Sequence, residues 1–168
     1  MSKVLHLAEI LHHDHQAVRR LQWSAEDFGY DYRSSLIKRG EVEAVVLATE
    51  LILEHSTPEA VKETMGEFAN WRREHQPQGA TIGSMFKNPP DDYAGRLIDE
   101  AGLKGTRRGE IEISPVHANF FINYGGGTAQ DVYRLIRHTK QVVADKFNIQ
   151  LELEIELIGE WQEGIEDD

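Results

Sequence analysis

The sequence predicts a fold that combines strands and helices in two successive parts. Residues 4–54 contain long apolar runs bounded by polar turns, which are typical of strands. The rest of the chain contains stretches with apolar residues at helical spacing, separated by shorter β-like runs and by a segment rich in glycine and proline. We therefore expect a β-rich region first and a mixed region of helices and strands after it.

Three apolar runs in the first part predict three strands, at residues 4–11, 18–21 and 42–53. The polar residues 12–15 between the first two runs predict a hairpin turn. A small sheet with so much apolar surface is typical of a fragment of a larger sheet. Residues 1–56 are therefore expected to complete their core against other parts of a protein.

A helix is expected to begin near Pro58, because proline suits the first helical turn. Ser56 and Glu59 resemble a capping box, and the Gln76-Pro77 pair should end the helix. Four residues share one helical face, and we interpret this mainly apolar stripe as core packing. They are Val61, Met65, Phe68 and Arg72.

Two more helices are expected further along the chain. A short helix should follow Asp91-Asp92 and stop at Gly102. A long helix should begin at Thr128, because Thr128 and Asp131 have the spacing of a capping box. The Gly125-Gly126-Gly127 run before it lacks the lysine and hydroxyl of a phosphate loop, so we interpret it as a turn into that helix.

The remaining strands are expected at residues 111–113, 118–124 and 149–157. In the last of these, apolar residues alternate with polar ones, so Glu152, Glu154 and Glu156 should share one face. That face is either a solvated outer surface or contributes one carboxylate to a site.

Composition restricts the function classes. The net charge of -11 argues against nonspecific nucleic-acid binding, which needs a basic surface. The chain has no cysteine, so disulfides, zinc ribbons and thiol nucleophiles are excluded. No apolar run reaches the roughly 20 residues of a membrane span, and residues 1–6 do not resemble a signal peptide. We expect a cytoplasmic protein that binds neither membrane nor nucleic acid.

Residues 83–90 are the strongest candidate for a functional loop. Two prolines and Gly83 prevent a helix, so the segment should hold Ser84, Lys87 and Asn88 in a stiff loop. Polar groups held in this way are typical of functional sites, although the same residues also form ordinary turns.

A metal site at the residues His12, His13, Asp14 and His15 is a weaker possibility. Adjacent residues on a hairpin point in different directions, so an exposed turn explains the cluster better and no metal site is expected.

Several motifs follow one another along the chain: Tyr30-Asp31-Tyr32-Arg33-Ser34-Ser35, then Gln76-Pro77 with Gly83-Ser84-Met85-Phe86-Lys87-Asn88-Pro89, residues 92–105, His117-Ala118-Asn119-Phe120, and Glu152-Leu153-Glu154-Ile155. In this order they resemble the UDP-N-acetylenolpyruvoylglucosamine reductases, flavin enzymes that complete UDP-N-acetylmuramate for the bacterial cell wall. The resemblance covers residues 4–158. The short connection at residues 38–41 resembles the form of the family without a tyrosine-bearing insertion.

The resemblance implies an α+β fold in two domains. Residues 1–56 would be the C-terminal part of an FAD-binding domain, and residues 57–168 would be a substrate-binding domain with helices packed on a small mixed sheet. The glycine-rich loops that hold flavin in the family are missing from this sequence. We therefore expect a truncated form or a misassigned start, and a chain that alone neither holds FAD tightly nor turns over.

The resemblance also implies the roles of individual residues. NADPH would reduce FAD, and hydride transfer to the enolpyruvyl group would leave negative charge that Arg33 and Glu154 stabilise while Ser84 donates a proton. Glu154 would donate a hydrogen bond only in its protonated form. Substrate would contact Tyr32, Lys87, Asn88, Arg72 and Arg73, although both arginines and Lys87 are equally explained as surface charges. Gly83, Ser84 and Arg33 would lie beside the flavin.

A stand-alone domain that binds a UDP-sugar without redox chemistry is the alternative function. Calorimetric titration with and without flavin would distinguish the two functions. The sequence leaves the oligomeric state and the preference for NADPH over NADH open.

Overall fold

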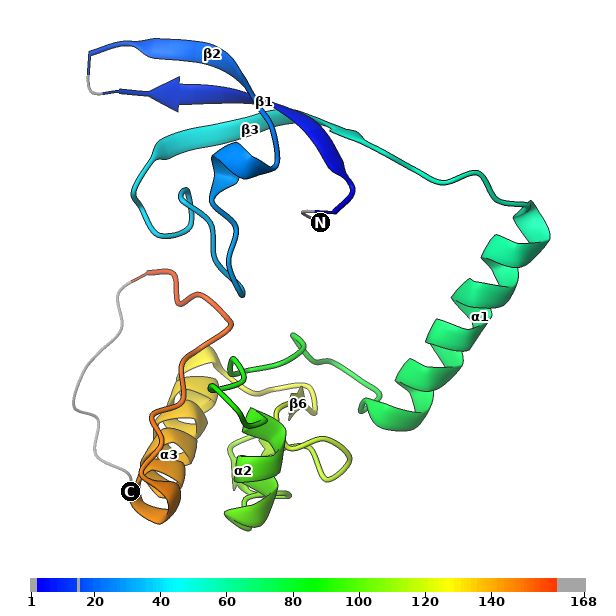
Figure 1. The fold of residues 1–168 in the computed structure, drawn as a ribbon. Helices are drawn as coiled ribbons and strands as arrows, with labels where there is room; N and C mark the ends of the chain where they lie inside the picture. Colours follow the sequence, from blue (N-terminus) through cyan, green and yellow to red (C-terminus); the bar gives the residue numbers. More distant parts are fainter. Residues whose placement is uncertain (1–2, 15, 160–168) are drawn as a thin grey trace. The chain divides into compact units, whose positions relative to one another are not determined.

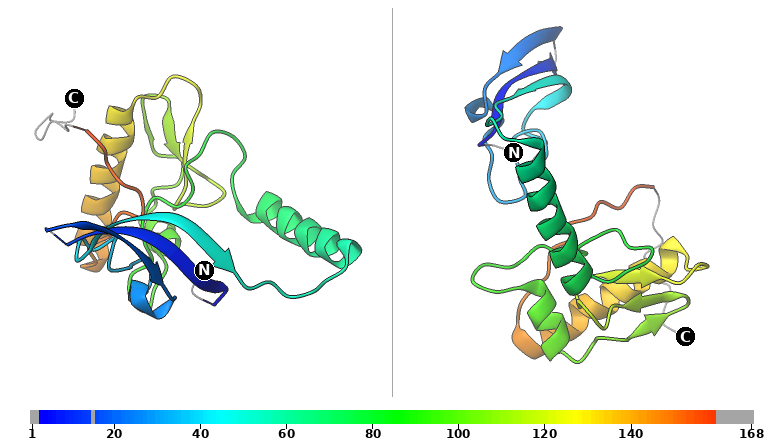
Figure 2. Two further views of the ribbon diagram at one scale, coloured as in Figure 1. Left: turned by 90° about the horizontal axis from the view of Figure 1, so that it is seen from above. Right: turned by 90° about the vertical axis from the view of Figure 1, so that its right-hand side faces the viewer.

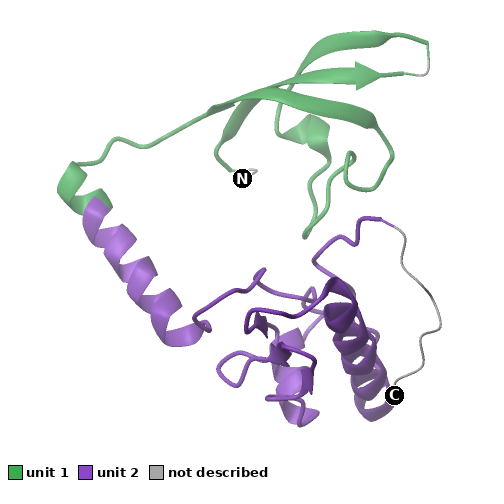
Figure 3. Cartoon of the chain, turned by 180° about the vertical axis from the view of Figure 1, so that it is seen from behind, with its two compact units in different colours: residues 1–61 green, residues 62–168 purple. Residues whose placement is uncertain are grey.

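The computed structural model describes residues 3–14 and 16–159. It divides the chain into two compact units, Met1–Val61 (unit 1) and Lys62–Asp168 (unit 2), which Figure 3 colours separately. Helices occur together with two separate three-stranded sheets, so the expected α+β class is confirmed. Both sheets are antiparallel, whereas the resemblance implied a mixture of strand directions in the second.

Unit 1 contains one antiparallel sheet of order β2-β1-β3 (Figure 1). In chain order its elements are β1 (Leu5–His13), β2 (Val18–Trp23), the short 3-10 helix η1 (Glu26–Phe28) and β3 (Glu43–Leu51). The three predicted strands and the hairpin turn are confirmed. Asp14 stabilises the turn, because its Oδ1 accepts the backbone N–H groups of Gln16 at 3.1 Å and Ala17 at 2.8 Å.

The core of unit 1 is small. Its fully buried apolar residues are Leu5, Ala8, Ile10 and Phe28. The strand β3 contributes little to this core, since Val45 is 60% exposed and Leu47 is 48% exposed. Burial of apolar surface stabilises a fold by roughly 25 cal/mol per Å², and a strand surface left in water does not contribute this free energy. The uncovered surface fits the expectation that this sheet is part of a larger one, which stays a prediction.

The helix α1 (Pro58–His75) crosses the boundary between the units. Its predicted limits are confirmed, but the hydroxyl of Thr57 accepts the N–H of Ala60 at 3.2 Å, where the sequence suggested a cap by Ser56. Neither α1 nor any other helix within the described residues is long and apolar enough to span a membrane.

The expected core packing of the α1 stripe is wrong. No residue of α1 is buried, and the side chains of Met65 and Phe68 are 65% and 66% exposed. Val61 is also exposed, as is Trp71 on the same helix. Amphipathic spacing shows that a helix has an apolar face, but it does not supply the partner that buries the face. The described part of the chain provides no such partner.

Unit 2 contains a long helix that packs between a small sheet and a second, shorter helix. Its elements after α1 are α2 (Ala94–Glu100), β4 (Arg107–Arg108), β5 (Ile111–Ile113), β6 (Phe121–Asn123) and α3 (Ala129–Phe147). The strand order is β4-β5-β6, and α3 packs against both α2 and the sheet (Figure 2). The buried core includes Phe86, Leu97, Ile113 and Leu135. The predicted positions of both helices and of β5 are confirmed. The strand expected at residues 118–124 is confirmed only for Phe121–Asn123, because Ala118 and Asn119 lie in a turn.

The beginning of α3 has the capping box that the sequence predicts. The Thr128 hydroxyl accepts the N–H of Asp131 at 3.1 Å, and the Asp131 carboxylate accepts the N–H of Thr128 at 2.9 Å. These hydrogen bonds from the backbone and hydroxyl of Thr128 lower the pKa of Asp131. The cap directs the apolar face of α3, including Leu135 and Val143, into the core.

Residues 149–157 do not form the expected strand. Its pairing is limited to one bridge between Leu153 and Phe86, and the backbone bends at Glu154 and Ile155. The partner is a loop rather than a strand, so pairing stops on either side of the bridge. The alternation is only partly realised, with Leu151 buried and Glu152 exposed, while Glu154 is half-buried.

Candidate active site

The loop of residues 83–90 is fixed to the rest of unit 2 by the side chain of Asn119. Its Oδ1 accepts the N–H of Phe86 at 2.9 Å, and its Nδ2 donates to the carbonyl of Phe86 at 2.8 Å. The backbone carbonyl of Asn119 accepts the N–H of Met85 at 2.8 Å. Asn119 is 3% exposed, and Met85 and Phe86 are fully buried. The amide of Asn119 therefore replaces a strand partner, and it holds the backbone just after Ser84.

The other side of the loop is joined to the last segment of the chain. The N–H of Lys87 donates to the carbonyl of Glu152 at 2.8 Å, and the N–H of Glu154 donates to the carbonyl of Met85 at 3.0 Å. This pairing holds the backbone of Glu154 beside the residue that follows Ser84. The structure thus brings two predicted catalytic residues, Ser84 and Glu154, into neighbouring segments.

The prediction that residues 83–90 are stiffly held is confirmed, and Asn88 contributes to it. Asn88 Oδ1 accepts the N–H of Ala94 at 3.1 Å, which satisfies a donor at the beginning of α2. The short helix is thereby attached to the loop. The amide nitrogen of Asn88 donates no hydrogen bond to another group within the described residues, which leaves a donor for a ligand.

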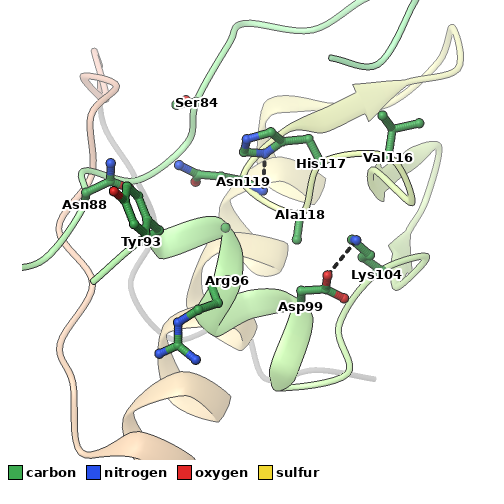
Figure 4. Close-up of a pocket in the computed structure, with 11 residues that line it drawn as sticks. Ser84, Asn88, Tyr93, Arg96, Asp99, Lys104, Val116, His117, Ala118 and Asn119 are labelled. Carbon is green, nitrogen blue, oxygen red and sulfur yellow. Dashed lines mark hydrogen bonds and ion pairs between the residues drawn. The ribbon is translucent and has the colours of Figure 1, made fainter. Parts of the chain in front are cut away.

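Ser84 and Asn88 line one cavity of about 460 Å³ (Figure 4). The cavity lies between the loop, the beginning of α2 and the turn before β6. Its other lining residues are Tyr93, Gly95, Arg96, Asp99, Lys104, Val116, His117, Ala118 and Asn119. Ser84 is half-buried and lies in the wall of the cavity rather than in the core.

The cationic residues of this cavity are paired with carboxylates. Arg96 contacts both Asp92 and Glu100, the latter at 2.6 Å, and Lys104 Nζ lies 2.6 Å from Asp99 Oδ2. The hydrogen bonds of Arg96 lower the pKa of Asp92 and raise the pKa of Arg96 itself. An anionic ligand would therefore meet cations that already have partners.

Sequence reasoning assigned no role to His117, which the structure places in the wall of this cavity. Its ring lies 4.9 Å from the ring of Phe120 in an edge-on arrangement, and its Nδ1 accepts the N–H of Asn119 at 3.2 Å. Burial lowers the pKa of His117, and the nearby charge of Lys104 lowers it further. The sequence contains one indication of this arrangement, a histidine and an asparagine within an otherwise apolar run. Polar side chains in such a run are expected to be buried, and buried polar groups require hydrogen-bond partners.

Arg33 and Tyr32 belong to unit 1, where they form the tip of a tight turn. Asp31 and Ser34 exchange backbone hydrogen bonds of 3.2 and 3.1 Å on either side of them. Arg33 has a φ of 53°, and its guanidinium carbon lies 5.7 Å from the centre of the Tyr32 ring. A left-handed conformation is costly for a residue with a side chain, and such strain is found preferentially at functional sites.

Arg72 and Arg73 lie elsewhere in unit 2 than Ser84 does. Both line a second cavity of about 480 Å³ at the end of α1, together with Met65, Phe68, Ala69, Gln76, Pro77 and Gln78. Arg73 Nη1 donates to Asn70 Oδ1 at 3.0 Å. Lys87 forms an ion pair with Glu152 at 3.1 Å. Of the substrate-binding residues expected from the sequence, Asn88 lines the first cavity, Arg72 and Arg73 line the second, Tyr32 lies in the turn of unit 1, and Lys87 lines neither cavity.

The described residues fit part of the flavin site that the resemblance implies. Gly83 has a φ of 85°, and a Cβ built there would meet nothing within 4 Å, so a flat ring can approach the backbone beside Ser84. The glycine run at residues 125–127, in contrast, offers no site for the diphosphate of FAD. The N–H groups of Gly125, Gly126 and Gly127 all donate to Asn123 Oδ1, so this glycine run is already occupied.

Within the described residues, no group of three or more histidine, aspartate or glutamate side chains is placed to hold a metal ion. His13 of the predicted cluster instead contacts Glu43, with Nδ1 2.5 Å from Oε2. The fourth member of the cluster, His15, lies outside the described residues.

Comparison with known proteins agrees with these observations. The family described as UDP-N-acetylenolpyruvoylglucosamine reductase, C-terminal domain, matches residues 75–158. A UDP-N-acetylenolpyruvoylglucosamine reductase of Chloroflexus aggregans is 43% identical over 142 residues, which cover 83% of this chain and 48% of the relative. One of Bacillus licheniformis is 37% identical over 162 residues, covering 95% of this chain and 85% of the relative.

The fold has a counterpart among solved structures. The crystal structure of UDP-N-acetylenolpyruvylglucosamine reductase from Thermus caldophilus superimposes with a TM-score of 0.75 at 36% identity, covering 92% of this chain and 53% of the other. The chain spans about half the length of most curated relatives that it matches, such as 48% and 53% of the two Chloroflexus proteins. The family match over residues 75–158 and the 43% identity over 83% of the chain show that the chain belongs to the UDP-N-acetylenolpyruvoylglucosamine reductase family.

Proposed function

We propose that this chain provides the proton-delivery and substrate-binding parts of an enzyme that reduces UDP-N-acetylglucosamine enolpyruvate to UDP-N-acetylmuramate in peptidoglycan synthesis. The observation that carries the proposal is the loop of residues 83–90. It holds Ser84 at the wall of a cavity, between segments that contain Asn119 and Glu154. A fixed donor at a cavity is what protonation of a reaction intermediate requires.

The proposed reaction requires a residue that donates a proton and residues that stabilise a negative charge. The hydride would be supplied to C3 of the enolpyruvyl group by FAD that NADPH has reduced. The electron pair of the double bond then moves to C2 and into the carboxylate. The O–H bond of Ser84 breaks as a C–H bond forms at C2, and water returns a proton to the Ser84 oxygen. Arg33 and Glu154 would stabilise the negative charge before the proton arrives.

The remaining residues would hold the substrate. Asn88 has an amide nitrogen available in the Ser84 cavity, while Arg72 and Arg73 line the second cavity, where guanidinium groups suit a diphosphate. Lys87 and Tyr32 would contribute a charge and a ring to the same substrate. Gly83 and Arg33 would lie next to the flavin, together with Ser84.

The proposed organisation assigns residues 1–56 to the end of an FAD-binding domain and residues 57–168 to a substrate-binding domain. The exposed apolar surface of β3 supports this assignment, since a complete domain normally covers such a surface. Most of the flavin would be held by the half of the longer relatives that these 168 residues do not match. We accordingly expect the isolated 168-residue chain to bind little FAD and to show no turnover.

A chimera tests the catalytic proposal. The 168 residues would replace the matching half of the Chloroflexus aggregans relative, and NADPH oxidation that depends on the UDP-sugar would be measured. We expect activity, and we expect Ser84→Ala to lower kcat by about 100- to 10,000-fold, the usual contribution of a positioned proton donor. Ser84→Cys, which keeps an acidic hydrogen, is the matched control and should retain more activity. Equal rates for Ser84→Ala and the unmodified chimera would contradict the role of Ser84.

A UDP-sugar-binding module without redox chemistry is the second candidate. The observation that favours it is that both cavities are built from residues of unit 2 alone. Calorimetric titration of the chain with UDP-N-acetylglucosamine enolpyruvate, with and without FAD, distinguishes the candidates. Tight binding that is independent of flavin, combined with an inactive chimera, would favour the module.

A further inference from the structure

We propose that His117 binds substrate directly, by donating a hydrogen bond from Nε2 to an anionic oxygen of the ligand in the Ser84 cavity. The inference rests on the proposed function and adds a residue to it. The anionic oxygen could belong to the enolpyruvyl carboxylate or to the diphosphate, which offer the same acceptor chemistry.

The tautomer of His117 follows from its local hydrogen bond. A backbone N–H can only donate, so the 3.2 Å contact with the N–H of Asn119 requires Nδ1 of His117 to be the acceptor. In a neutral imidazole the other nitrogen then carries the hydrogen. Nε2 is therefore a donor, and it makes no hydrogen bond to another group among the described residues.

The ring is held in one orientation by three neighbours. Phe120 packs edge-on against it with ring centres 4.9 Å apart, and Asn119 fixes Nδ1. On the third side is Gly95 of α2, where a Cβ would come within 3.0 Å of the Cε1 atom of His117. A glycine in a helix is less favourable than an alanine. Here its lack of a side chain leaves room for the imidazole.

The charge of the cavity favours a neutral donor at this position. Burial, with a smaller contribution from the charge of Lys104, lowers the pKa of His117, which favours the uncharged ring. The nearby cations Arg96 and Lys104 are already paired with carboxylates. A neutral N–H donor can bind an anionic oxygen without an additional buried charge when the cavity is empty.

Two amide substitutions separate ligand binding from a structural role. The amide oxygen of asparagine is two bonds from Cβ, as Nδ1 of histidine is, and the amide nitrogen of glutamine is three bonds from Cβ, as Nε2 is. His117→Asn therefore keeps the acceptor for the N–H of Asn119 and loses the donor in the cavity. His117→Gln keeps a donor in the cavity and loses the local acceptor.

The experiment is calorimetric titration of the 168-residue chain and both variants with UDP-N-acetylglucosamine enolpyruvate, alongside thermal unfolding of each protein. We expect His117→Asn to bind about 10- to 100-fold more weakly, the usual effect of losing a hydrogen bond to a charged group, with little change in melting temperature. His117→Gln should bind more tightly than His117→Asn although it is less stable. The reverse order of affinities, or equal affinities, would overturn the inference while leaving the proposed function intact.

Additional titrations identify the ligand oxygen. A weaker affinity of His117→Asn for UDP-N-acetylglucosamine, which lacks the enolpyruvyl group, would assign the contact to the diphosphate. An effect seen only with the enolpyruvyl compound would assign it to the carboxylate. Failure of the unmodified chain and of the unmodified chimera to bind either compound would overturn the proposed function and this inference with it.

Discussion

The Ser84 loop of unit 2 and the strand β3 of unit 1 differ in how completely the surrounding residues bury their apolar side chains. In unit 2, the loop that presents Ser84 lies on fully buried residues such as Met85 and Phe86. In unit 1, the strand β3 has apolar side chains that remain exposed, Val45 and Leu47 among them. The difference indicates that the Ser84 loop is supported by a core of its own unit, whereas β3 leaves apolar side chains uncovered.

The largest expected effect comes from deleting a core side chain in unit 2. Leu97 on α2 is 1% exposed, so Leu97→Ala leaves a cavity and should lower the free energy of unfolding of unit 2 by about 2–5 kcal/mol. Urea unfolding monitored by hydrogen exchange of unit 2 amides measures this change.

The matched control is Leu47→Ala on β3, where the side chain is 48% exposed. Its effect on unit 1 should lie within about 0.5 kcal/mol, as is usual for surface positions. A loss as large as that of Leu97→Ala would show that β3 is covered in solution and would remove the contrast between the units.

The next effect concerns the buried amide that fixes the Ser84 loop. Asn119→Ala leaves the N–H and the carbonyl of Phe86 buried without their partners, and each unsatisfied group costs about 1–3 kcal/mol. Unit 2 should lose roughly 2–4 kcal/mol in thermal unfolding. Asn70→Ala on the exposed helix α1 serves as the control. An unchanged melting temperature for Asn119→Ala would mean that the loop is held by its other contacts alone.

A smaller effect is expected from pH. The pKa of His117 is lowered in the folded protein, so the unfolded chain binds a proton more readily than the folded one. The stabilisation is complete above the unfolded pKa of about 6.5 and is lost as pH falls through the lower folded pKa. Arg96, Asp99 and Lys104 line the same cavity.

The measurement compares melting temperatures at neutral and mildly acidic pH in the unmodified protein and in His117→Asn. The decrease on acidification should be greater in the unmodified protein, because asparagine does not titrate. Identical decreases would show that another group causes the acid sensitivity.

The smallest effect is expected at the turn in unit 1. Arg33 has a left-handed conformation that glycine adopts without strain, so Arg33→Gly should not destabilise unit 1 and should stabilise it by at most about 1 kcal/mol. In the chimera the same change should lower the rate of NADPH oxidation, because it removes a cation. A variant that loses stability and keeps its activity would contradict the proposed role of Arg33.

The predictable part of the fold is the part determined by local chemistry. The capping box of Thr128 and the alternation and turns that give β1 and β2 are encoded in neighbouring residues, and the structure has them. The apolar stripe of α1 was misinterpreted because a pattern identifies an apolar face but not the surface that covers it. Residues 149–157 alternate as a strand does, yet a strand requires a partner of matching length, and the loop at Phe86 is too short.

The same distinction applies to the site. Ser84 was recognisable because glycine and proline mark the loop that contains it, and its order relative to the other motifs supports a role. The contributions of Asn119 and His117 depend on contacts between segments far apart in the chain, such as the 33 residues between Phe86 and Asn119. Sequence spacing alone does not reveal such contacts.

The two hydrogen bonds between the side-chain amide of Asn119 and the backbone of Phe86 have a consequence for chemical ageing. Deamidation of Asn119 would replace the Nδ2 donor with a carboxylate oxygen, which would then face the carbonyl oxygen of Phe86. One atom exchanged in a buried residue would turn an attraction into a repulsion directly beneath Ser84. Burial of Asn119, which is 3% exposed, shields from hydrolysis an amide on which the loop geometry relies.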